Sequence, residues 1–132
     1  MARAGRRIGV LICNQYTLFR EGIKALLEKE TSIEIVGEAS TAAEAIEQLE
    51  RLKPDVVLMD VGTPDLTGFE ATQRMKAIDP HVKVLILSVH EDEALISRCL
   101  EAGASGYIRK HDRATQLQSA IDAVCRIGDR AA

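Results

Sequence analysis

Two apolar stretches of this chain end in polar side chains that allow different chemistry. The stretch 55–60 ends in Asp60, whose carboxylate can act as a nucleophile or a metal ligand. The stretch Ile8–Cys13 is followed by Asn14 and Gln15, whose amides carry no charge. Mg²⁺-assisted phosphoryl transfer to a carboxylate needs further acids beside it. The first strand end therefore indicates phosphorylation of Asp60, and the second indicates a poorly bound metal. The alternative is an Asp60 that only ends a strand and opens a turn.

Five short apolar stretches alternate with five longer stretches of helical periodicity. They predict strands at Ile8–Cys13, 33–38, Val56–Asp60, 82–88 and 106–110, and helices at 17–30, 42–53, Gly68–Ile78, 91–102 and 113–127. Apolar strands separated by helices predict a parallel sheet covered on both faces, in a doubly wound α/β fold. Open sheets of this kind bind ligands at the carboxyl ends of their strands. The residues expected at that edge are Asn14, Gln15, Asp60, Ser88 and Lys110.

Local signals support several of these boundaries. Thr41 with Glu44, and Thr67 with Glu70, have the spacing of capping boxes that begin helices. Gly103 lies where a left-handed residue would end the fourth helix. These signals favour the helix assignments independently of the apolar periodicity.

Size and composition exclude several classes of protein. The chain has 132 residues and a net charge of −3, which indicates one domain with a single core. It has no basic stripe and few aromatic residues, so no nucleic-acid surface is expected within it. No apolar run approaches the roughly 18 residues that a membrane span requires. We expect a flexible basic lead at 1–7, the folded domain at 8–128 and a C-terminal tail at 129–132.

Neither the cysteines nor the histidines have the spacing of a metal site. The cysteines are Cys13, Cys99 and Cys125, and the histidines are His81, His90 and His111. The cysteines are far apart and have apolar neighbours, which predicts buried, reduced thiols and a cytoplasmic location. The histidines form no i, i+4 pair and have no nearby cysteine partner, so we expect ordinary surface side chains.

Four motifs in order resemble a known family. They are LFREG at 18–22, VGEA at 36–39, PDVVLMD at 54–60 and GASGY at 103–107. Together they closely resemble the receiver domain of a two-component response regulator, in its NarL/FixJ (LuxR-type) branch. The resemblance runs from about Ile8 to Ile127 and implies a flavodoxin/CheY-like (βα)5 fold with strand order 2-1-3-4-5. It also implies a signal-input function in transcription regulation, with a sensor histidine kinase as a possible partner.

The resemblance assigns roles to four residues of this chain. Asp60 would be the phosphoacceptor, and Lys110 would contact first that carboxylate and then the phosphoryl group. Ser88 would donate a hydrogen bond to the phosphoryl group, and Tyr107 would be the aromatic residue whose rotamer reports the change. The alternatives are an exposed lysine at a strand end, a serine in a turn and a tyrosine half-buried at the sheet edge.

The chain departs from the family where Mg²⁺ is bound. Asn14 and Gln15 occupy the positions of two acids that, with the acceptor, would bind the ion. Asp60 and the backbone carbonyl of Gly62 are the remaining ligands that the resemblance implies. Each lost carboxylate removes an attraction of roughly several kcal/mol before solvation offsets it. Mg²⁺ is therefore possible as a cofactor but is predicted to bind weakly or not at all.

Two signalling hypotheses follow from this departure. In the first, Asp60 is phosphorylated poorly or not at all, and the domain acts through a phosphorylation-independent conformation or dimer, with Lys110 paired to Asp60. In the weaker one, a kinase still delivers phosphate, and Asp65 or Asp92 partly replaces the missing charge.

Other functional classes are less favoured. An enzyme on this fold would need a phosphate loop or a nucleophile motif, and the chain has no GxGxxG, P-loop or GxSxG sequence. An interaction adaptor that has lost the switch remains an alternative. Family members usually continue into a helix-turn-helix domain, which this chain does not contain. A homodimer is plausible, although the apolar residues that could form a contact are more simply expected in the core: Leu95, Leu100, Leu117, Ile121 and Val124.

Overall fold

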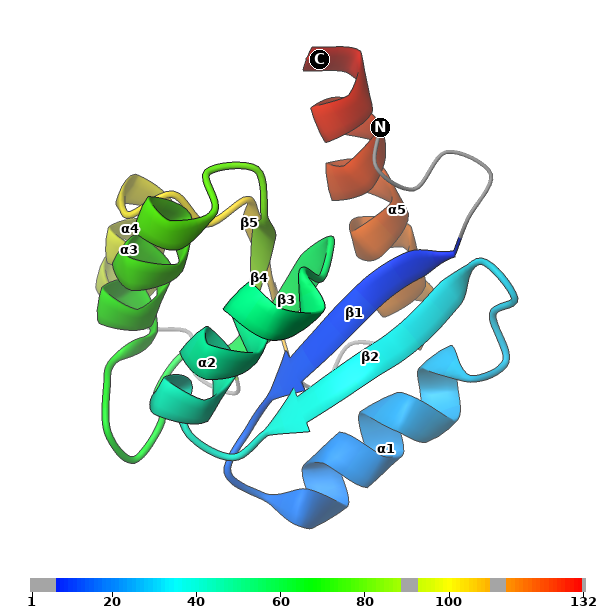
Figure 1. The fold of residues 1–132 in the computed structure, drawn as a ribbon, viewed down its shortest axis with the longest axis horizontal. Coiled ribbons are helices and arrows are strands. Elements are labelled where there is room, and N and C mark those ends of the chain that lie inside the picture. The colour runs from blue at the N-terminus through cyan, green and yellow to red at the C-terminus, as the bar shows by residue number, and fades with distance from the viewer. Residues whose placement is uncertain (1–6, 89–92, 110–113, 132) are drawn as a thin grey trace.

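The computed structural model describes residues 7–88, 93–109 and 114–131, and its centre is a parallel sheet (Figure 1). The 5-stranded sheet has the order β2-β1-β3-β4-β5, which confirms the predicted topology. Its strands are β1 (Ile8–Cys13), β2 (Ile33–Ala39), β3 (Val56–Asp60), β4 (Lys83–Ser88) and β5 (Gly106–Arg109).

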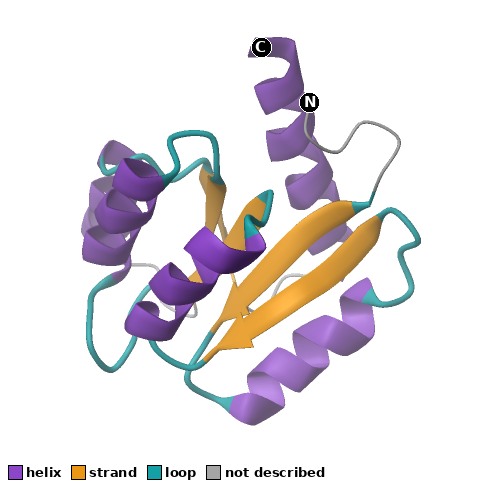
Figure 2. Ribbon diagram, viewed as in Figure 1, coloured by secondary structure: helices purple, strands orange, loops and turns teal. Residues whose placement is uncertain are grey.

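Helices cover both faces of this sheet, as Figure 2 shows. They are α1 (Thr17–Leu27), α2 (Ala42–Leu52), α3 (Gly68–Ile78), α4 (Glu93–Glu101) and α5 (Ala114–Ala131). One apolar cluster joins the sheet to α2, α3 and α4, and a second joins its other face to α1 and α5. The predicted α/β architecture with helices on both faces is confirmed.

The central strands are buried because helices cover both of their faces. Every residue of β3 is buried, and the residues of β1 from Val10 to Cys13 have no exposed surface. Cys13 lies beside Met59 in the parallel register, and Asp60 lies beside Leu87. The carboxyl ends of β1, β3 and β4 therefore meet at one edge of the sheet.

The local signals at the helix ends are confirmed. Thr41 accepts a hydrogen bond from the backbone of Glu44, and Thr67 accepts one from that of Glu70, each within a complete capping box. Gly103 has a φ of 114°, as its place after α4 predicts. The sequence does not predict how α2 ends. Lys53 ends this helix with a left-handed φ of 48°, although it is not glycine or asparagine.

Several boundaries and burial predictions were wrong in detail. Helix α1 ends at Leu27 and not at residue 30, because the chain then turns through Glu30 into β2. Helix α5 continues to Ala131 and so includes residues that the sequence suggests are a tail. Cys125 is only partly buried, at the border of one apolar cluster, and 40% of the Leu100 surface is exposed.

Within the described ranges, no helix is both long and apolar enough to span a lipid bilayer. His81 is exposed, as predicted, and lies in the turn between α3 and β4. His90 and His111 lie outside the described residues.

Candidate functional site

Asp60 lies at the carboxyl edge of the sheet with only 5% of its surface exposed. The side chain of Asn14, which is fully buried, approaches it from the end of β1, and Asn14 Nδ2 lies 3.2 Å from Asp60 Oδ2. The amide oxygen of Asn14 accepts a hydrogen bond from the backbone N–H of Tyr16 at 2.8 Å. The opposite amide orientation would place oxygen against carboxylate and NH₂ against N–H. The contacts therefore determine that Asn14 presents a donor to Asp60.

Gln15 does not share this buried position. Its side chain is exposed, whereas Asn14 immediately before it is buried. Of the two amides that the sequence suggests for the pocket, only Asn14 is therefore seen in contact with Asp60.

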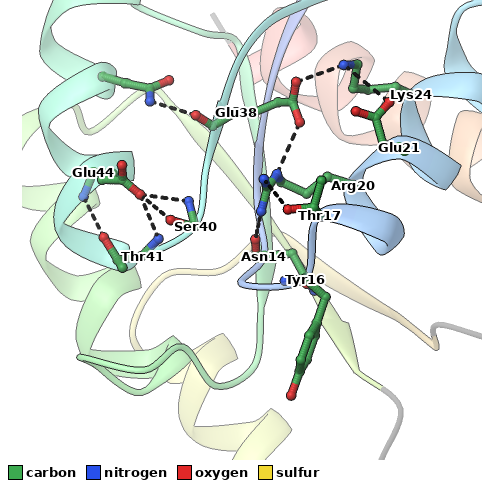
Figure 3. Close-up of polar contacts among 11 residues, drawn as sticks. Asn14, Tyr16, Thr17, Arg20, Glu21, Lys24, Glu38, Ser40, Thr41 and Glu44 are labelled. Atoms are coloured by element: carbon green, nitrogen blue, oxygen red, sulfur yellow. Dashed lines mark hydrogen bonds and ion pairs between the residues drawn. The ribbon is translucent and has the colours of Figure 1, made fainter.

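A charged network that the sequence did not predict reaches the backbone of Asn14 through Arg20 (Figure 3). Arg20 Nη1 donates to the carbonyl oxygen of Asn14 at 2.6 Å, and Arg20 Nε donates to Glu38 Oε1 at 3.1 Å. Lys24 Nζ donates to the other oxygen of Glu38 at 2.9 Å. The network joins the start of α1 to the ends of β1 and β2. The available signals for it were two of the motifs, LFREG, which contains Arg20, and VGEA, which contains Glu38.

The network also affects the protonation of Glu38. The ammonium of Lys24 and then the guanidinium of Arg20 lower the pKa of Glu38 from its usual 4.5. The carboxylate form is therefore the one that the folded protein stabilises.

We expect Glu38→Gln to lower the free energy of unfolding by about 0.5 to 1 kcal/mol at pH 7, because it removes two partly exposed ion pairs, with Lys24 and with Arg20. The folded pKa lies below the unfolded one, so the contribution is complete above the usual value of 4.5 and is lost as the pH falls through the lower folded value. Urea unfolding between pH 7 and about pH 3 checks this. Glu47→Gln, at an exposed position of α2, is the matched control. A difference that stays constant with pH would contradict the prediction.

The β3–α3 loop, residues 61–67, is short and closed on itself. The backbone N–H of Val61 donates to Leu87 O at 3.0 Å, and the N–H of Gly68 donates back to Val61 O at 2.7 Å. Gly62 forms an antiparallel bridge with Thr67. The exposed Gly62 therefore lies in a loop whose two ends are hydrogen-bonded to each other at Val61, the residue that follows Asp60.

The carboxylate of Asp65 lies at the N-terminus of α2. Its two oxygens accept hydrogen bonds from the N–H groups of Ala42 at 3.0 Å and Ala43 at 2.9 Å. Thr63 Oγ1 donates a third bond at 3.0 Å. Burial acts to raise the pKa of Asp65, but these hydrogen bonds outweigh it and lower the pKa below its usual value. Both oxygens thus have protein partners, which does not favour Asp65 as a replacement metal ligand.

The Cys13 thiol is buried at the end of β1. Its Sγ donates to Thr41 O at 3.4 Å. Burial, followed by the charges of Asp60 and Asp65, raises the pKa of Cys13 to about 12. Cys13 is therefore a neutral thiol near neutral pH and not a thiolate ligand.

The remaining predicted site residues are described only in part. Ser88 ends β4 beside Arg109, at the same edge as Asp60, and its side chain is not described. Tyr107 lies beside Ile86 with 45% of its surface exposed, consistent with a tyrosine at the sheet edge. Lys110 and Asp92 lie outside the described residues.

Mg²⁺ requires oxygen ligands, most often carboxylates and waters in octahedral geometry. Across residues 7–88, 93–109 and 114–131, no three His, Cys, Asp or Glu side chains group as a metal site would need. Asn14 directs N–H groups and not an oxygen toward Asp60. In the described arrangement, these donors do not fit a Mg²⁺ site of the kind that two neighbouring acids would form.

Comparison of the sequence with known proteins gives concordant matches. A family profile for the response regulator receiver domain matches residues 10–122. The chain is 39% identical over 122 residues to the transcriptional regulatory protein DegU of Brevibacillus brevis, covering 92% of this chain and 52% of DegU. It is 37% identical over 117 residues to the response regulator UvrY of Escherichia coli (strain K12), covering 89% of this chain and 54% of UvrY. The chain thus spans about half the length of these curated relatives.

Solved structures agree with the sequence matches. A two-component response regulator of the LuxR family from Aurantimonas sp. SI85-9A1 superposes with a TM-score of 0.87 at 32% identity, covering 91% of this chain and 86% of that one. The signal receiver domain of the putative response regulator NarL from Mycobacterium tuberculosis also has a TM-score of 0.87, at 28% identity, covering 91% of this chain and 97% of that one.

Proposed function

This chain belongs to the response regulator receiver domain family, of the LuxR/NarL type, and on that basis we propose that Asp60 is its phosphoryl acceptor. Receiver domains are in general signalling modules, which bind Mg²⁺ at an acidic pocket and accept phosphate from sensor kinases. The position of Asp60 supports the proposal, since it ends a buried central strand at the edge where ligands of open α/β sheets bind.

We further propose that phosphorylation of Asp60 is weak in this chain. The contact between Asn14 Nδ2 and Asp60 Oδ2 at 3.2 Å carries this proposal. An amide donor occupies one oxygen of Asp60 but adds no negative charge that would attract a divalent cation. Neither Gln15 nor Asp65 replaces the missing negative charge beside Asp60. The side chain of Gln15 is exposed, and the carboxylate of Asp65 is hydrogen-bonded to the first turn of α2.

We expect little radiolabel to transfer from acetyl phosphate to the wild-type chain in millimolar Mg²⁺, and none to the Asp60→Asn variant. A receiver domain with both acids serves as the positive control for the reaction. Rapid labelling of the wild type that Asp60→Asn abolishes would support Asp60 as the acceptor and refute the weakening. Labelling that survives in Asp60→Asn would refute Asp60 as the acceptor.

The same contact between Asn14 and Asp60 favours a second function, which is signalling without phosphorylation. Because Asn14 already donates a hydrogen bond to Asp60, the domain can act through a phosphorylation-independent conformation or homodimer. Sedimentation with and without acetyl phosphate distinguishes the two functions. A dimer that forms equally in both conditions favours the independent mode, and one that requires the phosphodonor favours the relay.

The full-length activity is also a proposal. Because the matched relatives are about twice as long and include a transcriptional regulatory protein, we propose that this receiver controls an output domain in transcription. Residues Ser88, Tyr107 and Lys110 are proposed as its switch and phosphate-contact residues. A sensor histidine kinase as phosphate donor and a cytoplasmic location stay predictions.

A further inference from the structure

The β3–α3 loop is attached to a helix that is distant in the sequence. Asp65 is 23 residues from Ala42 and 22 from Ala43, and its carboxylate accepts a hydrogen bond from each of their N–H groups. The first turn of α2 needs such acceptors, because its N–H groups have no partner within the helix. Thr41 and Glu44 satisfy other groups of the same turn, so Asp65 completes the set.

The same loop begins directly after Asp60. The bond from Gly68 N–H to Val61 O closes the loop at its base, so Asp60 and Asp65 lie on one short, internally bonded segment. The buried thiol of Cys13 lies next to the start of α2 as well. It donates to the carbonyl of Thr41, the residue that caps α2, and both carboxylates raise its pKa. Both acids therefore act on the same buried thiol, although Asp60 is itself buried and Asp65 is exposed.

We propose that Asp65 is a positioning residue that couples the charge at Asp60 to helix α2. Negative charge added at Asp60 repels the Asp65 carboxylate and weakens its hold on the Ala42 and Ala43 N–H groups, and charge removed there strengthens it. The inference rests on the proposed function only for its physiological trigger, a phosphoryl group on Asp60. It identifies the N-terminus of α2 as a part of the domain that responds to the pocket.

A purely structural role predicts something different. If Asp65 only caps α2, replacing it destabilises the helix, but the state of Asp60 has no effect on the α2 amides. The two roles are therefore separated by whether a change at Asp60 is detected at Ala42 and Ala43.

The experiment measures amide hydrogen exchange by NMR in the wild type and in Asp60→Asn, without any phosphodonor. We expect exchange at Ala42 and Ala43 to slow about fivefold in Asp60→Asn, the lower range of measured couplings between sites. In the Asp65→Asn background, the same Asp60→Asn change is expected to leave these two amides unaltered. Exchange that Asp60→Asn leaves unchanged in the wild-type background would overturn the coupling, as would an equal slowing in the Asp65→Asn background.

Asp55→Asn is the matched control. Asp55 directly precedes β3, at the end of the strand opposite to Asp60, where its carboxylate accepts the N–H of Gly9 at 2.8 Å. Its replacement should not alter exchange at Ala42 or Ala43, and an equal slowing there would assign the effect to net charge and overturn the inference. No step of this experiment involves phosphoryl transfer. Its failure is therefore independent of the labelling test of Asp60.

Discussion

The double substitution Asn14→Asp and Gln15→Asp is expected to strengthen Mg²⁺ binding by about two orders of magnitude. At 4 Å and an effective dielectric of 20, two unit charges interact by roughly 4 kcal/mol. If one third of this survives solvation, the two added carboxylates contribute on average about 1.4 kcal/mol each, which is tenfold in affinity per acid. The change at Asn14 should dominate, because this buried side chain already contacts Asp60.

Isothermal titration calorimetry of the wild type, the two single variants and the double variant measures this effect. Gln73→Glu, at an exposed position of α3, adds an acid away from the pocket and should leave the affinity unchanged. Without Mg²⁺, Asn14→Asp should lower the unfolding temperature, because it buries a second carboxylate beside Asp60, and Mg²⁺ should restore it. A wild type that already binds Mg²⁺ as tightly as the double variant would refute the weakened pocket.

The substitution Gly68→Ala is expected to destabilise the domain by about 2 to 3 kcal/mol, the upper part of the usual cost of overpacking. A Cβ at Gly68 would lie 2.7 Å from the carbonyl oxygen of Val61, which is backbone and cannot rotate away. The same oxygen accepts the N–H of Gly68 at 2.7 Å, so relief of the clash would lengthen the bond that closes the β3–α3 loop. The substitution should therefore both distort the β3–α3 loop and lower the free energy of unfolding.

Urea unfolding of Gly68→Ala and of a matched Gly22→Ala variant checks this expectation. Apart from its chain neighbours and the backbone of its own helix, no atom lies within 4 Å of a Cβ built at Gly22, which is inside α1. Alanine there should stabilise the protein by about 0.5 to 1 kcal/mol, since it restricts the unfolded chain and suits a helix. Equal effects of the two substitutions would show that the contact with Val61 is not what requires glycine at position 68.

Much of the fold could be predicted because its signals are local. The apolar run of β3 and the paired spacings of Thr41 with Glu44 and Thr67 with Glu70 each act within a few residues. The strand and both capping boxes that they predict were confirmed. The ends of α1 and α5 were predicted less well. Polar residues at a helix end are compatible with helix or turn, and packing decides between them.

The sequence by itself determined which strand ends carry Asp60 and Asn14, and hence which donors and acceptors are available at the sheet edge. Only the tertiary structure decided the pairing: Asn14 donates to Asp60 across 46 residues, and Asp65 accepts hydrogen bonds from the start of α2. The physical reason is that hydrogen-bond capacity belongs to each side chain, whereas the choice of partner depends on which strands and loops the crossovers bring together.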